Sequence, residues 1–315
     1  MTALATHPNQ QFLSEVRAGL SRPQKRLPCK YFYDQRGSEL FDQICELDEY
    51  YPTRTELTIT RRYAAEMAEQ IGPRAALVEY GSGSSLKTRL LLDELIDPIA
   101  YVPVEICESH LVAAAERIGK RYPLIDVLPV CTDFTQAFAL PTFPRMPSHA
   151  AAYFPGSTIG NFPPEAARRL LASIRQTVGA GGGAILGIDL QKPVKVLEAA
   201  YNDAAGVTAA FNLNLLERIN RELDANFSLD DFEHRADYDP EHGRIDMLLV
   251  AQREHEVEIA GEPVRFRRGE TIHTEHSHKY TLDGFTRLAA RAGLTVRKAW
   301  TDPRDWFAVV HLVAE

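Results

Sequence analysis

The spacing of hydrophobic residues along the chain changes near residue 75 from a helical period to short apolar runs. Before this point, Phe12, Val16 and Leu20 recur at helical spacing, and residues 53–71 continue a second amphipathic pattern. Pro52 stands where a proline can open a helix. We therefore expect two N-terminal helices, joined by an aromatic, loop-like stretch that contains the sequences KYFYDQRGSELF and DEYYPTRTE.

From residue 75 onward, short apolar runs alternate with amphipathic segments. We expect strands at residues 75–80, 100–106, 124–133, 150–155 and 183–190, with helices at residues 84–95, 109–122 and 165–178 between them. Strands that alternate with helices are typical of βαβ units on a mainly parallel sheet.

The alternation stops after Asp189 and returns at residue 281. In the interval, residues 195–223 have a helical pattern, and strand-like runs lie around residues 227–238, 245–250 and 264–280. A helix at residues 281–293, with Gly293 at its C-cap, and two closing strands follow. The pattern predicts an α/β fold with a doubly wound sheet domain at residues 73–190 and 281–315. A second, α+β domain is expected from residues 1–72 and 191–280.

Composition narrows the class of protein. The 315 residues are 45% apolar and 25% charged, which is ordinary globular usage, and the net charge is −8. An acidic chain argues against nucleic acid or an anionic membrane as the main partner. The start of the chain is polar, and its four cysteines are scattered without a CxxC pair. We expect a cytoplasmic protein with reduced thiols and no membrane or nucleic-acid partner.

The first expected strand of the sheet ends in a glycine-rich loop with the sequence EYGSGSSLKT, from Glu79 to Thr88. Such a turn lets a ligand approach the backbone at a helix N-terminus. A dinucleotide fingerprint and a Walker A loop both require glycine where this chain has Leu86. A third interpretation of the loop is the E-x-G-x-G motif, which is the loop of Rossmann-like S-adenosylmethionine (SAM) methyltransferases. SAM carries no phosphate, so neither the third glycine nor a phosphate-binding lysine is needed.

Acidic residues at the ends of the next strands fit the same reading. Glu105 follows the loop by about twenty residues, a spacing at which a carboxylate can accept the ribose hydroxyls of an adenosine. Asp133 can accept from the adenine amino group, and Phe134 can stack near the ring.

Six sequence motifs extend the resemblance to one family. These motifs are KYFYDQRGSELFDQI, EYYPTRTE, EYGSGSSLKT, YVPVEI, FPGSTIGNF and IHTEHSHKY. Together they resemble the histidine Nα-methyltransferases of ergothioneine biosynthesis. The resemblance covers nearly the whole chain. It implies a Rossmann-like SAM methyltransferase sheet with a substrate-binding domain. It also implies transfer of three methyl groups from SAM to the α-amine of L-histidine, giving hercynine. Glu105 departs from the aspartate expected in the family, which should shift the ribose contact without abolishing it.

The resemblance assigns roles residue by residue. The expected SAM-binding residues are Glu79, Gly81, Ser82, Gly83, Lys87, Glu105, Asp133 and Phe134. The expected substrate-binding residues are Tyr33, Phe41, Tyr50, Tyr51, Asn161, Tyr201, Met247, Glu275 and Ser277. Asn161 and Tyr201 would hold the amino-acid end, and the aromatic residues would form a wall beside the amine. Either Tyr50 or Tyr51 faces the substrate, and spacing does not decide between them. Tyr33, Tyr51 and Asn161 are the expected catalytic residues, because positioning dominates this displacement and a tyrosine hydroxyl or a water can relay the proton.

The residues of IHTEHSHKY are suited to recognise the imidazole ring of a histidine substrate. Strand alternation predicts His273, Glu275 and Ser277 on one face. An imidazole has one donor and one acceptor, so a carboxylate and a hydroxyl complement both edges. His276 and His278 share the other face and would be able to ligate zinc, but no third ligand is evident at a matching spacing, so we expect no metal.

Two other functions remain open from the sequence. The same fold can methylate another amino acid such as tryptophan or tyrosine, although the chain keeps the Glu275–Ser277 pair that complements histidine. A non-catalytic SAM-sensing protein is the alternative outside enzymes, but it would not need a second polar cluster shaped for an amino acid. We expect a monomer whose small-molecule substrate is L-histidine.

Overall fold

The computed structural model describes residues 8–83 and 85–314. The chain divides into two compact units: unit 1 comprises Met1–Glu49 and Val194–Ser277, and unit 2 comprises Tyr50–Pro193 and His278–Glu315. The first boundary lies at residues 49 and 50, whereas the sequence pattern suggested residues 72 and 73. The reason is packing: Ile59 and Met67 of the long N-terminal helix lie in the core of unit 2, with Leu77 and Val309.

Unit 2 contains a mainly parallel sheet. Its strands are β2 (Ala75–Tyr80), β3 (Ala100–Glu105), β4 (Asp126–Val127), β5 (Val130–Cys131), β6 (His149–Phe154), β7 (Gly183–Asp189), β13 (Leu294–Thr301) and β14 (Phe307–Ala314). Their order is β13-β14-β7-β6-β2-β3-β4, with β5 also paired to β3. Strands β2, β3, β6 and β7 are parallel, whereas β14 is antiparallel to β7 and β13. The expected alternating sheet is confirmed, although its third strand is two short strands.

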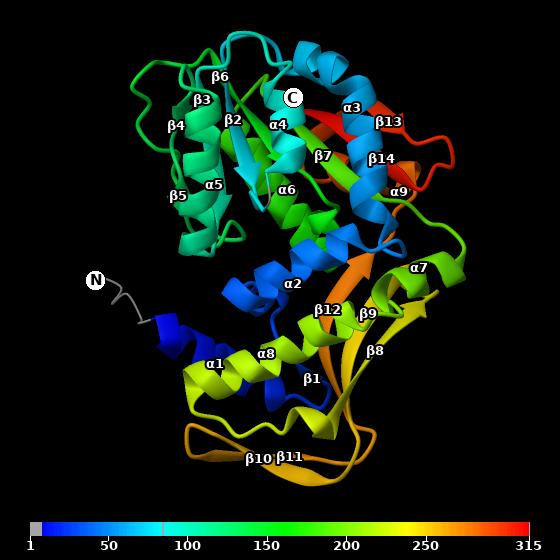
Figure 1. The fold of residues 1–315 in the computed structure, drawn as a ribbon. Helices are drawn as coiled ribbons and strands as arrows, with labels where there is room; N and C mark the ends of the chain where they lie inside the picture. Colours follow the sequence, from blue (N-terminus) through cyan, green and yellow to red (C-terminus); the bar gives the residue numbers. More distant parts are fainter. Residues whose placement is uncertain (1–7, 84, 315) are drawn as a thin grey trace. The chain divides into compact units, whose positions relative to one another are not determined.

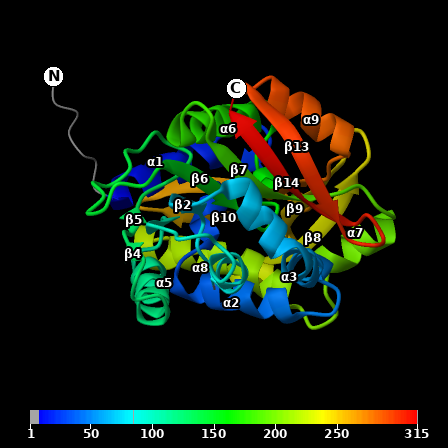
Figure 2. The ribbon, with the colours of Figure 1, turned by 90° about the horizontal axis from the view of Figure 1, so that it is seen from above.

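Helices cover both faces of this sheet (Figure 2). Those of unit 2 are α3 (Tyr51–Ile71), α4 (Leu86–Leu92), α5 (Glu108–Arg121), η2 (Thr158–Asn161), α6 (Pro164–Val178) and α9 (Leu282–Ala290). Successive strand residues point to opposite faces. Leu77 therefore packs in the core with residues of α3, α4 and α5, while Val78 packs in the core with residues of α6 and α9.

Unit 1 is built on a four-stranded sheet, shown in Figure 1, of order β1-β12-β9-β8. These strands are β1 (Lys25–Arg26), β8 (Phe232–Asp239), β9 (Arg244–Ala251) and β12 (Thr271–His278), and β10 (His255–Ile259) with β11 (Glu262–Phe266) forms a separate hairpin. The helices are α1 (Pro8–Leu20), η1 (Cys29–Phe32), α2 (Gln35–Glu46), α7 (Val194–Tyr201), α8 (Val207–Leu223) and η3 (Leu229–Asp231). On β9, buried and half-buried residues alternate, so one face of the strand lies in the core.

The helix expected at residues 195–223 is two helices. Asp203 separates them, because its carboxylate accepts the backbone N–H groups of Val207 and Thr208 at 2.8 Å each and so begins α8. None of the helices in residues 8–83 and 85–314 has the length and apolar character needed to cross a membrane.

Candidate functional site

The loop after β2 has the backbone shape that a closely bound ligand requires. Gly81 has φ +78° and donates its N–H to the Val104 carbonyl at 2.9 Å. Gly83 has φ +40°, and no described atom lies within 4 Å of the position that a Cβ would take there. Ser82 is buried, and its hydroxyl has no hydrogen-bond partner in the described part of the chain. Ser84 lies outside the described residues. An open backbone beside an unsatisfied hydroxyl fits a polar cofactor such as SAM.

Glu79 lies beneath this loop. Its carboxyl group is buried and accepts the Thr88 hydroxyl at 2.6 Å and the Tyr101 hydroxyl. Burial raises the pKa of Glu79 to about 8. The side chain is therefore mainly protonated at neutral pH, and it ties the start of α4 to β3.

Lys87, expected on the cofactor, makes an ion pair with a buried carboxylate. Its Nζ lies 2.5 Å from Glu56 Oε2 on α3. The same carboxylate accepts the Gly156 N–H, with oxygen distances of 3.0 and 2.9 Å. Glu56 thus joins the first turn of α4 to the loop after β6. Glu56 lies within the EYYPTRTE motif, and the sequence suggested no role for it; an acidic residue among the buried positions of a helix was the available signal.

The acids at the next two strand ends lie where the pattern predicted them. Glu105 ends β3, and its Oε1 accepts the Ile106 N–H at 2.8 Å. Burial raises the pKa of Glu105. Asp133 follows β5, and its Oδ1 accepts the Thr135 N–H at 3.0 Å. Phe134 packs edge-to-face against Phe154, with ring centroids 5.6 Å apart.

Asn161 ends the short helix η2 after β6. The turn that begins this helix is held by Ser157, which has φ +57° and whose Oγ accepts the Asp189 N–H at 2.8 Å. A Cβ at Gly160 would come within 2.8 Å of the His278 carbonyl, so only glycine fits there. Asn161 is therefore placed by a constrained turn at the carboxyl end of the sheet.

The two candidate tyrosines differ in environment. Tyr50 is half-buried at the N-cap of α3, whereas Tyr51 is fully buried. The Tyr51 hydroxyl donates to Asp189 Oδ2 at 2.7 Å and accepts from Lys192 Nζ at 2.9 Å. Lys192 and Lys279 both pair with the Asp189 carboxylate, at 2.5 and 2.8 Å. Burial lowers the pKa of Lys192 to about 8. Sequence reasoning missed this group of charges, since its members are far apart in the chain.

Tyr33 and Phe41 belong to an aromatic cluster in unit 1. Their ring centroids lie 5.7 Å apart in an edge-to-face arrangement. Phe211 of α8 completes the cluster, 5.9 Å from Tyr33 and 6.0 Å from Phe41. Phe211, which the sequence did not single out, thus packs against two of the residues expected in the aromatic wall.

The residues expected at the imidazole lie on β9 and β12 of the same unit, and Tyr201, expected at the amino-acid end, lies on α7. The hydroxyls of Tyr201 and Ser277 are 2.7 Å apart. Glu275 and Ser277 are 8% and 5% exposed, and Met247 is buried on β9. His234 bonds the Tyr201 carbonyl at 2.8 Å and so fixes the end of α7.

One prediction about β12 is wrong. His273 does not share a face with Ser277: it lies beside His276, with ring centroids 3.9 Å apart. Thr274 bonds Asn212 of α8, while Ser277 bonds Tyr201 of α7, so these two residues face the helices. The two-residue alternation of the strand therefore shifts by one residue between Thr274 and Ser277.

The predicted residues separate by unit. Unit 2 contains the residues expected at the cofactor, together with Tyr50, Tyr51 and Asn161. Unit 1 contains the other residues expected at the substrate, which are Tyr33, Phe41, Tyr201, Met247, Glu275 and Ser277.

Comparison with known proteins gives consistent matches. The profile of a family described as "Histidine-specific methyltransferase, SAM-dependent" matches residues 12–314. A histidine N-alpha-methyltransferase of Mycolicibacterium smegmatis is 43% identical over 300 residues, covering 94% of this chain and 92% of that protein. One of Mycobacterium tuberculosis is 41% identical with the same coverage. "Ergothioneine biosynthesis protein 1" of Neurospora crassa is 29% identical over 92% of this chain, which matches 33% of that protein.

Proposed function

The chain belongs to the family of SAM-dependent, histidine-specific methyltransferases, and we propose that it methylates the α-amino nitrogen of L-histidine three times. The product is hercynine, and the reaction belongs to ergothioneine biosynthesis. The observation that carries the proposal is the buried pair Glu275 and Ser277 on β12, in a chain that the family profile matches over residues 12–314.

The cofactor, when bound, supplies a methyl group on a positively charged sulfur. Gly81 and Gly83 leave the backbone accessible to it, and the Ser82 hydroxyl is available as a hydrogen-bonding group. Glu105 suits the ribose hydroxyls, while Asp133 and Phe134 suit the adenine. Glu79 and Lys87 support this site from within the protein through Thr88, Tyr101 and Glu56.

Histidine is held at both of its ends in this proposal. Glu275 and Ser277 complement the two nitrogens of the imidazole, and Met247 packs beneath it. Asn161 and Tyr201 orient the amino-acid end. Tyr33 and Phe41 present aromatic faces to a nitrogen that becomes a quaternary ammonium, which aromatic rings attract.

The nitrogen must lose a proton before each transfer, and we assign the relay to Tyr51. Its hydroxyl already donates to Asp189 and accepts from Lys192. With a pKa of about 8, Lys192 becomes neutral at mildly alkaline pH, and its hydrogen bond with Tyr51 can then reverse so that the amine accepts the proton that the tyrosine passes on. Positioning supplies most of the acceleration, because the sulfonium is already activated. The transfer thus needs no metal ion, and we propose that the enzyme acts in the cytoplasm as a monomer.

The test is to incubate the pure chain with SAM and each of the twenty amino acids and to read the products by mass spectrometry. We expect mono-, di- and trimethylated product from histidine alone. Methylation of a different amino acid in preference to histidine would overturn the substrate assignment, and binding of SAM without any product would favour a sensing protein.

A further inference from the structure

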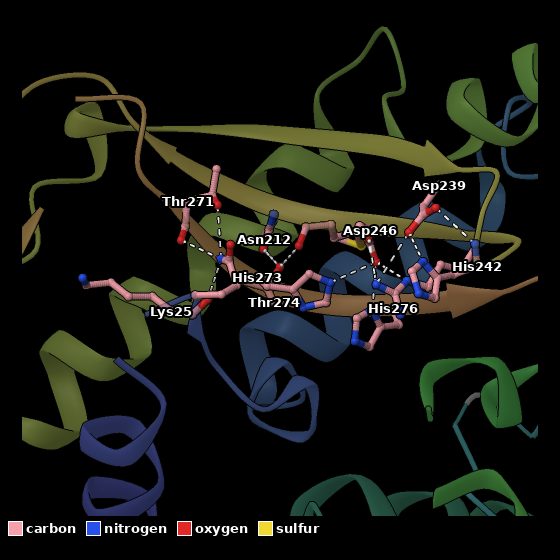
Figure 3. A network of polar contacts seen from close by, with 12 residues as sticks. Lys25, Asn212, Asp239, His242, Asp246, Thr271, His273, Thr274 and His276 are labelled. Atoms are coloured by element: carbon pink, nitrogen blue, oxygen red, sulfur yellow. Dashed lines mark hydrogen bonds and ion pairs between the residues drawn. The ribbon is translucent and has the colours of Figure 1, made fainter. Parts of the chain in front are cut away.

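We propose that Asp246, His273 and His276 of unit 1 form a binding site for a divalent transition-metal ion of the zinc type. The inference stands on the geometry of β9 and β12 alone and does not depend on the proposed methyl transfer. Figure 3 shows the three side chains converging from the two neighbouring strands.

The donor atoms already lie close to one another. Asp246 Oδ1 is 3.1 Å from His273 Nε2 and 2.8 Å from His276 Nδ1. One ligand atom from each residue can be chosen so that all three lie within 4.8 Å of one another. Zinc binds nitrogen and carboxylate oxygen at about 2.0–2.2 Å, so two ligands of one tetrahedral ion lie roughly 3.4 Å apart. The two distances from Asp246 to the histidines therefore need to change by only a few tenths of an ångström to admit the ion.

The side chains are also held in place. All three are carried by strands of one sheet and are mostly shielded from solvent, with side-chain exposures of 18% for Asp246, 11% for His273 and 9% for His276. Two imidazoles and one carboxylate are a donor set that zinc, nickel and iron accept. Three protein ligands leave a fourth tetrahedral position for water.

The structure supplies what the sequence lacked. The spacing suggested His276 and His278 as a possible pair and showed no third ligand. The shifted alternation of β12 instead brings His273 beside His276, and the neighbouring strand contributes Asp246, which is 27 residues before His273. A ligand from a different strand leaves no spacing signature in the sequence.

Arg244 competes with the ion. Its Nε lies 2.8 Å from Asp246 Oδ1 without a hydrogen bond of adequate geometry, whereas its Nη2 donates to Asp246 Oδ2 at 3.3 Å. Asp239 lies 3.8 Å from the Arg244 guanidinium and offers it a second carboxylate. An ion at Asp246 would displace Arg244 toward Asp239. We therefore expect moderate affinity, set by the competition between Arg244 and the metal for one carboxylate.

The test uses the full chain, stripped of metal with a chelator and titrated with Zn²⁺ and Co²⁺. Calorimetry gives the stoichiometry, and the absorption of bound Co²⁺ reports nitrogen and oxygen ligands. We expect one ion per chain, with affinity reduced more than about tenfold in Asp246→Asn, His273→Ala and His276→Ala. Arg244→Met should bind several-fold more tightly, since the competing charge is gone.

His278→Ala is the matched control, because it removes a histidine from the same strand and should leave the affinity unchanged. Circular dichroism of each variant checks folding. If Arg244→Met folds as the wild type does, Co²⁺ titration of this variant tests the site without the competing arginine. Absence of stoichiometric binding in both the wild type and Arg244→Met would overturn the proposal and leave a cluster held by hydrogen bonds alone. An equal loss of binding in His278→Ala would also overturn it.

Discussion

The hydroxyl of Tyr201 at the end of α7 lies 2.7 Å from the hydroxyl of Ser277 on β12. This contact ties a helix to the strand that also carries Glu275, and both side chains are buried. A hydroxyl that is already fixed by a neighbour can present its remaining lone pair or proton to a ligand in one direction. In the proposed function, the contact therefore orients Ser277 toward the imidazole.

Removing this contact should weaken histidine binding moderately. Ser277→Ala and Tyr201→Phe each delete one neutral hydrogen-bonding group, which costs about 0.5–1.5 kcal/mol. We expect KM for histidine to rise several-fold in each variant. The double variant should be less impaired than the product of the two effects, because the two residues share one contact. Strictly multiplicative effects would mean that the two hydroxyls act separately.

Glu275 should determine which amino acid is accepted. A buried carboxylate that bonds the histidine imidazole loses that hydrogen bond when the ligand is apolar, which costs roughly 1–3 kcal/mol. Glu275→Ala with Met247→Val should therefore lose much affinity for histidine and gain binding or methylation of tryptophan. The measurement is the ratio of kcat/KM for histidine over tryptophan, with Glu258→Ala on the exposed surface of β10 as the control. A ratio that stays at the wild-type value would exclude Glu275 from substrate selection.

Asn161→Ala should reduce turnover of histidine strongly while SAM affinity stays unchanged. The substitution removes an oriented hydrogen-bonding group at the end of η2, and the proposed reaction depends on positioning. Steady-state kinetics together with calorimetry of SAM binding separate the two effects. Wild-type kcat/KM in this variant would show that Asn161 serves only the turn.

Gly83→Val should abolish SAM binding. The side chain would fill the open space beside the loop, and φ of +40° disfavours a β-branched residue. Gly179→Val is a matched control, because Gly179 also has positive φ, +73°, and open space, but lies at the end of α6. Calorimetry should detect SAM binding to the control alone. Equal affinity in Gly83→Val and the wild type would refute the assignment of this loop.

Glu79 should make stability depend on pH. Its pKa is raised from 4.5 to about 8 by burial, so the folded state holds a proton that the unfolded state releases. The resulting stability is complete below about pH 4.5 and is lost as the pH rises through about 8. Urea unfolding at pH 6, 7, 8 and 9 should give a smaller decrease for Glu79→Gln, which keeps the shape and cannot ionise, than for the wild type. Parallel curves for the two proteins would show that Glu79 is ionised in the fold.

The sequence predicted the sheet of unit 2 well because its central strands β2, β3, β6 and β7 are short, mainly apolar runs. Ala75–Tyr80 is buried along its whole length, as a strand covered on both faces must be. The sequence could not predict that α3 belongs to unit 2, because an amphipathic pattern shows that a helix has a buried face but not which sheet covers it. In the structure, Ile59 and Met67 of α3 lie in the core of unit 2.

Two further features of the site could not be predicted from the sequence: the partner of Lys87 and the directions of the side chains on β12. The resemblance assigned Lys87 to the cofactor, and the sequence could not show its ion pair with Glu56, which belongs to another helix. The regular alternation assumed for β12 was wrong, because the shift that separates His273 from Ser277 is not marked by a glycine or a proline.

The most direct measurement of the central claim locates the methyl groups on the product. The chain is incubated with histidine and SAM carrying a ¹³C-labelled methyl group, and the product is examined by NMR and tandem mass spectrometry. We predict three equivalent labelled methyl groups on the α-nitrogen and an unmodified imidazole. Label on an imidazole nitrogen, or histidine recovered unlabelled while SAM is bound, would contradict the account.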